Sequence, residues 1–165
     1  MKYAKILRML GIAMVLSLLL VTVTAAPVQA ARGVTLSPDE GKIGDRITVS
    51  GTGFNKSTAE TDKYAAIFFS SDEASVLDNI DTDVTHYKRV RGGVYLDEEG
   101  DFSTYFDVPD KLDDGASTVD VAPGTYYVYV CHYLGTTIQT AILAVAEFTV
   151  VGGEIAIDPD EGPVD

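Results

Sequence analysis

The sequence predicts an all-β protein built as a two-sheet β-sandwich, and three observations point to this class. Beyond residue 30, apolar residues recur mainly at every second position, in runs of strand length. Glycine and proline separate these runs at short intervals, as they do in turns between strands. No stretch beyond residue 30 carries an apolar period of about 3.6 residues. Short strands with this spacing are typical of a sandwich or a barrel.

The expected strands cover residues 34–37, 46–50, 64–69, 93–97, 101–108, 124–133 and 142–151, with the last two joined around Gly135. The acidic stretch 98–100 is interpreted as a hairpin turn between two of them. The polar segment 71–91 is interpreted as a long loop or an added edge hairpin. Gly51 and Gly53 flank a turn for which glycine is suited because positive φ is free of steric strain there.

Residues 1–30 are set apart from the fold by their composition. Three basic residues within the first eight precede an apolar run over residues 9–26, and the small residues Val28 and Ala30 follow it. This pattern predicts a signal peptide over residues 1–30 with cleavage after Ala30. An uncleaved membrane anchor is the alternative, because about eighteen apolar residues can just span a bilayer.

The charge balance excludes two classes of partner. The chain has 12 basic and 25 acidic residues, a formal net charge of −13 at pH 7. Cleavage after Ala30 would leave nine basic residues against 25 acidic ones, a formal charge of −16. This balance argues against nucleic acid, whose binding needs clustered basic residues. It also argues against contact with anionic membranes after signal cleavage.

An internal repeat indicates the domain organisation. Residues 34–43 resemble residues 155–164 at an offset of 121, and the four residues Pro-Asp-Glu-Gly are identical at 38–41 and 159–162. A fixed offset is typical of a tandem array, and a chance resemblance of two acidic turns is the alternative. We therefore expect one domain over residues 31–152. Residues 153–165 are interpreted as a short linker and the start of a truncated second repeat.

Glycine-rich motifs cover both ends and the centre of residues 33–151. The opening motifs read Val34-x-Leu36-x-Pro38-x-x-Gly41-x-x-Gly44 and Ile47-x-Val49-x-Gly51-x-Gly53-Phe54. The later motifs read Gly100-Asp101-Phe102, Phe106-x-Val108-Pro109, Gly124-Thr125-Tyr126-x-Val128-x-Val130 and Ala146-x-Phe148-x-Val150. This pattern resembles the immunoglobulin-like IPT/TIG domains, most closely the tandem forms of bacterial and archaeal surface proteins. The resemblance implies an immunoglobulin-like sandwich of the E-set type that binds or spaces without catalysis.

The strand 124–133 has two faces of different character. Tyr126, Val128 and Val130 share the expected core face, and Tyr126 lies where immunoglobulin-like sandwiches place a buried corner tyrosine. Tyr127, Tyr129 and Tyr133 alternate on the other face together with Cys131. Because exposed tyrosines serve protein and sugar recognition, Tyr127, Tyr129 and Tyr133 are the candidate contact surface. The alternatives are that they simply favour strand formation, or that the 71–91 segment packs over them.

The sequence offers no catalytic constellation, and we expect no enzyme activity and no cofactor. Cys131 is the one cysteine, so an intrachain disulfide is excluded, and its neighbour His132 points to the opposite face of the strand. His86 lies in a polar segment where a solvated histidine is the ordinary interpretation. Phosphate-loop and zinc-ligand spacings are absent, so no metal ligands are assigned.

Two acidic clusters raise calcium binding as an alternative. One lies at residues 97–101 and the other contains Asp78, Asp81 and Asp83. Calcium prefers oxygen-rich loops, but neither cluster has the ligand spacing of an EF-hand, and solvated acidic turns are the simpler interpretation.

These observations predict a secreted or cell-surface protein whose domain is a non-catalytic structural or adhesive module. Its expected partners are neighbouring immunoglobulin-like repeats of the same chain, and extracellular proteins or carbohydrates. An accessory binding domain of an extracellular enzyme, or a calcium-dependent binding domain, remains as an alternative.

Overall fold

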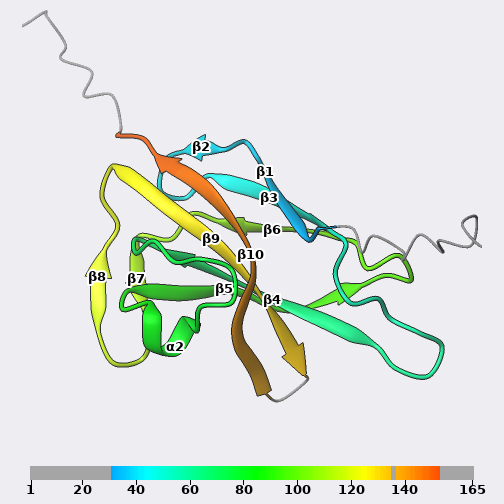
Figure 1. Cartoon of the computed structure of the whole chain (residues 1–165). Helices are drawn as coiled ribbons and strands as arrows, with labels where there is room; N and C mark the ends of the chain where they lie inside the picture. Colours follow the sequence, from blue (N-terminus) through cyan, green and yellow to red (C-terminus); the bar gives the residue numbers. More distant parts are fainter. Residues whose placement is uncertain (1–30, 135–136, 153–165) are drawn as a thin grey trace, which may run out of the picture. The chain divides into compact units, whose positions relative to one another are not determined.

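The computed structural model describes residues 31–134 and 137–152, and these form an all-β protein (Figure 1). The predicted signal peptide, the turn around Gly135 and the predicted second repeat lie outside the described residues. One sheet has the order β1 (Gly33–Ser37), β3 (Arg46–Thr52), β6 (Phe102–Asp107). The other has the order β2 (Glu40–Gly41), β10 (Thr137–Val150), β9 (Gly124–Leu134), β4 (Lys63–Ser70), β5 (Tyr87–Leu96).

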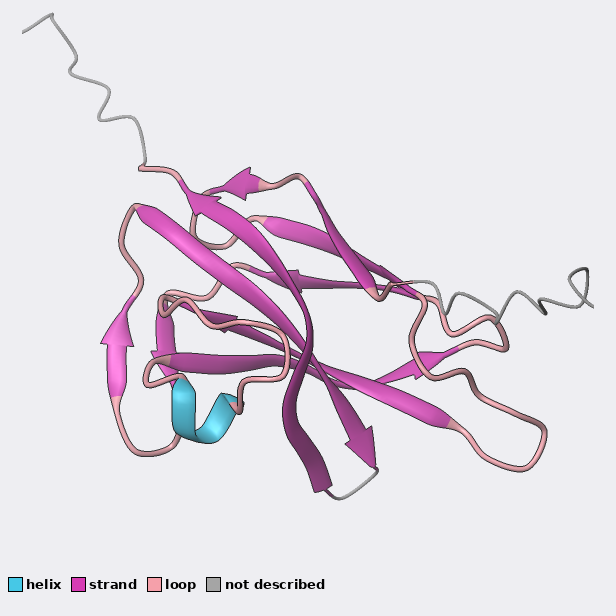
Figure 2. Cartoon of the chain, viewed as in Figure 1, coloured by secondary structure: helices cyan, strands magenta, loops and turns pink. Residues whose placement is uncertain are grey.

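A two-stranded pair and a short helix complete the described part of the chain. β7 (Lys111–Asp113) pairs with β8 (Thr118–Asp120), and the helix α2 (Ile80–Asp83) lies in the connection between β4 and β5 (Figure 2). In the described residues, no helix is both long and apolar enough to cross a membrane. The prediction of an all-β protein is therefore confirmed.

The two large sheets share one hydrophobic core, which the alternation of the strands produces. On β3, Ile47 and Val49 are fully buried between exposed neighbours, and on β6 Phe102 and Phe106 alternate with exposed residues in the same way. Tyr126 and Val128 face the core from β9, as predicted. Burying a side chain of this size contributes about 1.5–3 kcal/mol, so this face-to-face packing is the main source of stability.

A buried tyrosine anchors the start of β9. The hydroxyl of Tyr126 accepts a hydrogen bond from the backbone N–H of Ala122 at 2.9 Å and donates one to the carbonyl oxygen of Ala122 at 3.0 Å. Its ring stacks on Phe69 with 4.9 Å between ring centroids. The prediction that Tyr126 is buried on the core face is confirmed.

The predicted hairpin at residues 98–100 is wrong. The turn does reverse the chain, because Asp97 accepts backbone hydrogen bonds from Gly100 and from Asp101. However, β5 pairs with β4 and β6 pairs with β3, so the turn carries the chain from one sheet to the other (Figure 1). A turn signal in the sequence reports a reversal and not the partners of its flanking strands.

Two glycines near Phe54 meet different requirements. Gly53 has a φ of 74°, as the turn prediction requires. Gly51 lies within β3 instead, and a Cβ atom there would stand 2.0 Å from a ring carbon of Phe102. Gly51 is therefore needed for close packing of the Phe102 ring and not for a positive φ.

Candidate functional site

The tyrosine face of β9 is covered by the connection between β4 and β5. Tyr129 and Cys131 are fully buried, whereas Tyr127 and Tyr133 are half-buried. Ile80 and Val84 from the covering segment pack against them in a second apolar cluster. The structure therefore has the alternative arrangement, in which the segment packs over the tyrosines. Tyr129 cannot belong to an exposed contact surface, and that part of the prediction is wrong.

Asp72 fixes the covering segment in place. The hydroxyl of Tyr129 donates to the carbonyl oxygen of Asp72. The Asp72 carboxylate accepts the backbone N–H groups of Thr85 at 2.8 Å and His86 at 3.0 Å, and lies 3.4 Å from Nδ1 of His86. Partial burial opposes ionisation, but these donors outweigh it and lower the pKa of Asp72. His86 therefore belongs to the group of hydrogen bonds around Asp72 and is not a solvated loop histidine.

The predicted polar segment 71–91 is divided in the structure. Residues 71–86 form the covering connection with α2, and Tyr87 begins β5. Leu77 donates its backbone N–H to the carbonyl of Ile142, and Ile142 donates its own to Asp78, both at 2.8 Å. These bonds lie where the pairing of β10 with β9 shifts register, which frees the main chain of β10 for the connection.

Cys131 and His132 do not form a reactive pair. Cys131 packs in the apolar cluster with Tyr129, and burial raises the pKa of its thiol to about 12. A thiol with this pKa carries almost no thiolate at neutral pH, so it is a poor nucleophile. Burial also lowers the pKa of His132, with a smaller contribution from Arg32 and Lys63. Among the described residues, Nε2 of His132 is the one buried side-chain polar atom without a hydrogen-bond partner.

The acidic clusters cap backbone turns. In the first cluster, Oδ1 of Asp97 accepts the N–H groups of Glu99 and Asp101, and Asp101 accepts that of Gly53. In the second, Asp78 accepts from Ser75 at 2.7 Å and Asp83 accepts from Asn79 at 2.8 Å. The structure, where it describes the chain, gathers no group of three or more ligand side chains that could hold a metal ion.

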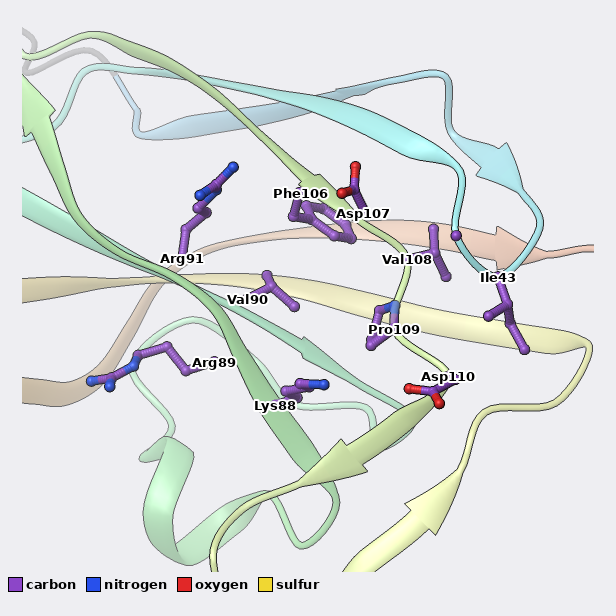
Figure 3. A pocket seen from close by; sticks show the side chains of 11 residues that line it. Ile43, Lys88, Arg89, Val90, Arg91, Phe106, Asp107, Val108, Pro109 and Asp110 are labelled. Atoms are coloured by element: carbon purple, nitrogen blue, oxygen red, sulfur yellow. The ribbon is translucent and has the colours of Figure 1, made fainter.

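A groove of about 510 Å³ lies at the side of the sandwich where the two sheets meet (Figure 3). β5 is the last strand of one sheet and β6 is the last strand of the other, so each has one side of its main chain without a partner strand among the described residues. The groove is lined by Ile43, Gly44, Lys88, Arg89, Val90, Arg91, Phe106, Asp107, Val108, Pro109 and Asp110. It thus combines an apolar lining with basic residues of β5. Of these, Arg89 lies opposite Phe68, so its side chain is on the outer face of the sheet with Tyr87.

The basic side chains of this groove stand out in an acidic protein. Lys88, Arg89 and Arg91 are three of the nine basic residues beyond residue 30, and they lie within four consecutive positions. The ion pairs of the described residues involve Arg46, His86 and Lys111, which leaves Lys88 and Arg89 without a carboxylate partner. The sequence interpretation missed this cluster because it described the whole 71–91 segment only as a polar long loop or an added edge hairpin. The signal was local and visible in the sequence.

Two arginine side chains pack on the ring of Tyr105, which lies on β6 beside the groove. The guanidinium groups of Arg46 and Arg91 lie 4.2 Å and 4.5 Å from the centroid of its ring, which is cation–π distance. Arg91 also donates to the carbonyl oxygen of Tyr105, and so bridges the two edge strands. Arg46 binds both carboxylate oxygens of Asp107, at 2.9 Å and 3.3 Å, and this pairing lowers the pKa of Asp107.

A second hollow lies on the other side of Arg89, near Tyr87 and Asp81. The hydroxyl of Tyr87 donates to Asp81 at 3.0 Å, and partial burial together with Asp81 raises the pKa of Tyr87 to about 12. Asp113 and Asp114, which also line it, accept backbone N–H groups of their own turn. The carboxylates that line this hollow therefore already accept hydrogen bonds from neighbouring residues.

No family model matches this chain, and no curated protein matches it either. Among solved structures, it is similar to the alkylpurine DNA glycosylase of Pseudomonas fluorescens, at 17% identity and a TM-score of 0.36, over 74% of this chain and 31% of that one. It is also similar to the beta-glucosidase of Listeria innocua, at 17% identity and a TM-score of 0.41, over 73% of this chain and 16% of that one. The chain thus spans less than a third of each. Similarity at this level carries no argument about its activity.

Proposed function

We propose that residues 31–152 form an immunoglobulin-like domain of the E-set type. The strand order is the observation that carries this proposal. In immunoglobulin sandwiches the sixth strand pairs with both the third and the seventh, and the second pairs with the fifth. The order β10-β9-β4-β5 in one sheet and the pairing of β3 with β6 in the other correspond to this scheme. The hydrogen bonds between Tyr126 and Ala122 correspond to the tyrosine corner of immunoglobulin sandwiches.

The split of the first strand supports the same assignment. β1 pairs antiparallel with β3, whereas β2 runs parallel to β10 in the other sheet. The chain changes sheets around Pro38, which explains the position of a proline in the opening motif. The first strand therefore closes both sheets at one edge.

We further propose that this domain is a non-catalytic structural or adhesive module, exported by residues 1–30 and followed by related copies. Its reactive groups serve the fold: Asp72 and His86 hold the connection over β9, and the Cys131 thiol has a pKa of about 12. The identical Pro-Asp-Glu-Gly sequences 121 residues apart support the tandem arrangement.

Expression of residues 1–165 in a bacterial host, followed by cell fractionation and N-terminal sequencing, tests the proposed export. We expect the protein outside the cytoplasm with Ala31 as its first residue. An intact N-terminus on cytoplasmic protein would contradict export. Sequencing the gene beyond codon 165 separates the two module hypotheses, because further sandwich repeats support a structural array and a hydrolase domain supports an accessory binding role.

A further inference from the structure

Three tyrosines form a row across the outer face of the five-stranded sheet. Tyr64 on β4 lies opposite Tyr95 of β5 and opposite Tyr133 of β9 in the strand register. Residues directly opposite each other in paired strands direct their side chains to the same face. This is the face of β9 that also carries Tyr129. With about 4.8 Å between neighbouring strands, the row is about 10 Å wide. We call Tyr64, Tyr95 and Tyr133 the tyrosine row.

The rings of the tyrosine row lie at the surface. Tyr95 is 50% exposed, and Tyr64 and Tyr133 are half-buried. The rings of Tyr64 and Tyr95 meet edge to face, with 5.9 Å between their centroids and 67° between their planes. A Cβ atom at Gly93 would stand 3.7 Å from the Tyr133 ring, so this ring reaches across β4 towards β5. The connection over Tyr129 therefore leaves this aromatic surface accessible to a partner.

A carboxylate and a guanidinium lie beside the tyrosine row. Tyr64 donates its hydroxyl to the carboxylate of Asp62 at 3.2 Å, which places this carboxylate next to the row. Arg89 lies on the same face of the sheet, and its Cδ and Nε atoms are 3.8 Å and 3.9 Å from the position of a Cβ atom at Gly92. Arg89 also lines the hollow near Tyr87. Neither Asp62 nor Arg89 forms an ion pair with any residue that the structure describes.

These groups define the chemistry of a partner. Aromatic rings favour contact with a flat apolar surface. A carboxylate accepts hydrogen bonds and a guanidinium donates them, so a partner with hydroxyl groups satisfies both, because a hydroxyl can do either. Opposite charges beside the row disfavour a partner of either sign, since one of the two charges repels it. An uncharged pyranose sugar, with C–H groups on its faces and hydroxyls at its rim, has this combination.

We propose that the tyrosine row binds an uncharged oligosaccharide, whose sugar rings stack on the three tyrosines and whose hydroxyls form hydrogen bonds with Asp62 and Arg89. The balance of charge at the row selects this occupant in a chain that has 25 acidic and 12 basic residues. Because the tyrosines lie on three adjacent strands of one sheet, little rearrangement is needed for binding. The proposal rests on the adhesive form of the proposed function, to which it adds a partner.

Nuclear magnetic resonance of the protein expressed as residues 1–165 measures this binding through its amide chemical shifts. Cellohexaose, maltohexaose and mannohexaose are the probes, because all three are uncharged and they differ in linkage or in sugar. We expect at least one of them to shift amide signals of β4, β5 and β9 around the tyrosine row, in a saturable manner. Absence of shifts with all three, or shifts confined to other strands, would overturn the proposal. Equal shifts with deca-proline would indicate a proline-rich peptide as the partner and would also overturn it.

Single substitutions identify the surface. Tyr95→Ala should weaken oligosaccharide binding about three- to tenfold, because it removes the most exposed ring of the row. Asp62→Ala and Arg89→Ala should each weaken it about tenfold, because each removes a hydrogen bond to a charged group. Tyr105→Ala is the matched control, since Tyr105 is a 43% exposed tyrosine of the other sheet, and it should bind like the unmodified protein. Equal loss in the control, or unchanged affinity in Tyr95→Ala, would refute the assignment.

Circular dichroism of each variant verifies folding. Export is tested separately by cell fractionation, so a folded and exported protein that binds none of the three oligosaccharides would overturn this proposal alone.

Discussion

The hydroxyl of Tyr129 donates a hydrogen bond to the main-chain carbonyl of Asp72, 57 residues earlier in the sequence. This bond joins the centre of β9 to the start of the connection that covers it. It turns what the sequence presents as an exposed tyrosine into part of the interior, and it places the connection among the stabilising elements of the fold.

Replacing Tyr129 tests this relationship. Tyr129→Ala should lower the free energy of unfolding by about 3–5 kcal/mol, because it leaves a cavity under the connection. Tyr129→Phe keeps the ring and should cost about 1 kcal/mol for the lost hydrogen bond. Tyr127→Ala is the matched control, since Tyr127 is a half-buried neighbour on the same face, and it should cost clearly less than Tyr129→Ala. Urea denaturation measures all three. A larger cost at Tyr127 would mean that the connection does not cover β9.

Asp72 should make stability depend on acid pH. Its pKa is lowered in the folded state, so its contribution is present above the unfolded-state value of about 3.9 and is lost as the pH falls through the folded-state value. Asp72→Asn should lower stability at pH 7 and flatten the pH dependence below about pH 4. Denaturation midpoints between pH 7 and pH 2 measure this. If Asp72→Asn shows the same acid dependence as the unmodified protein, the hydrogen bonds of Asp72 do not stabilise the connection.

His132 should act in a higher pH range. Burial lowers its pKa in the folded state, so the unfolded chain takes up a proton below about pH 6.5 that the folded chain does not bind. Stability should therefore decline as the pH falls from about 6.5. His132→Leu removes the titrating ring and its unpaired Nε2 atom, and should lose less stability between pH 7 and pH 5 than the unmodified protein. Parallel curves for the two proteins would show that His132 is not buried as a neutral ring.

Gly51 and Phe102 should be energetically coupled. Gly51→Ala places a Cβ atom 2.0 Å from the Phe102 ring, so the ring or the strand must move, at a cost of about 1–3 kcal/mol. Phe102→Leu alone should cost about 1–2 kcal/mol. The double variant should be more stable than the sum of the two costs predicts, because the smaller side chain makes room for the Cβ atom. If the two costs add in a double-mutant cycle, the main chain at Gly51 does not lie close to the Phe102 ring.

The alternation of residues predicted the core faces correctly. Ile47 and Val49, and likewise Phe102 and Phe106, are buried. A strand in one of two packed sheets directs every second side chain toward the other sheet. The same periodicity could not reveal what covers the outer face at Tyr129. Its cover comes from residues 71–86, whose packing depends on contacts far apart in the sequence.

The candidate site shows a similar division. Lys88, Arg89 and Arg91 form a local cluster that the sequence displays directly. Their groove needs β5 and β6 to be the edge strands of different sheets, and this follows from long-range pairing. A turn of suitable composition at 98–100 fits a hairpin and a crossing between sheets equally well, so local sequence could not decide between them.

Strand pairing measured by nuclear magnetic resonance tests the central claim most directly, because the proposed domain and the groove both need β5 and β6 in different sheets. We expect cross-strand contacts between main-chain protons of β3 and β6, as at Val49 and Thr104, and of β4 with both β5 and β9. A continuous antiparallel ladder between residues 93–97 and 101–108 would contradict the account.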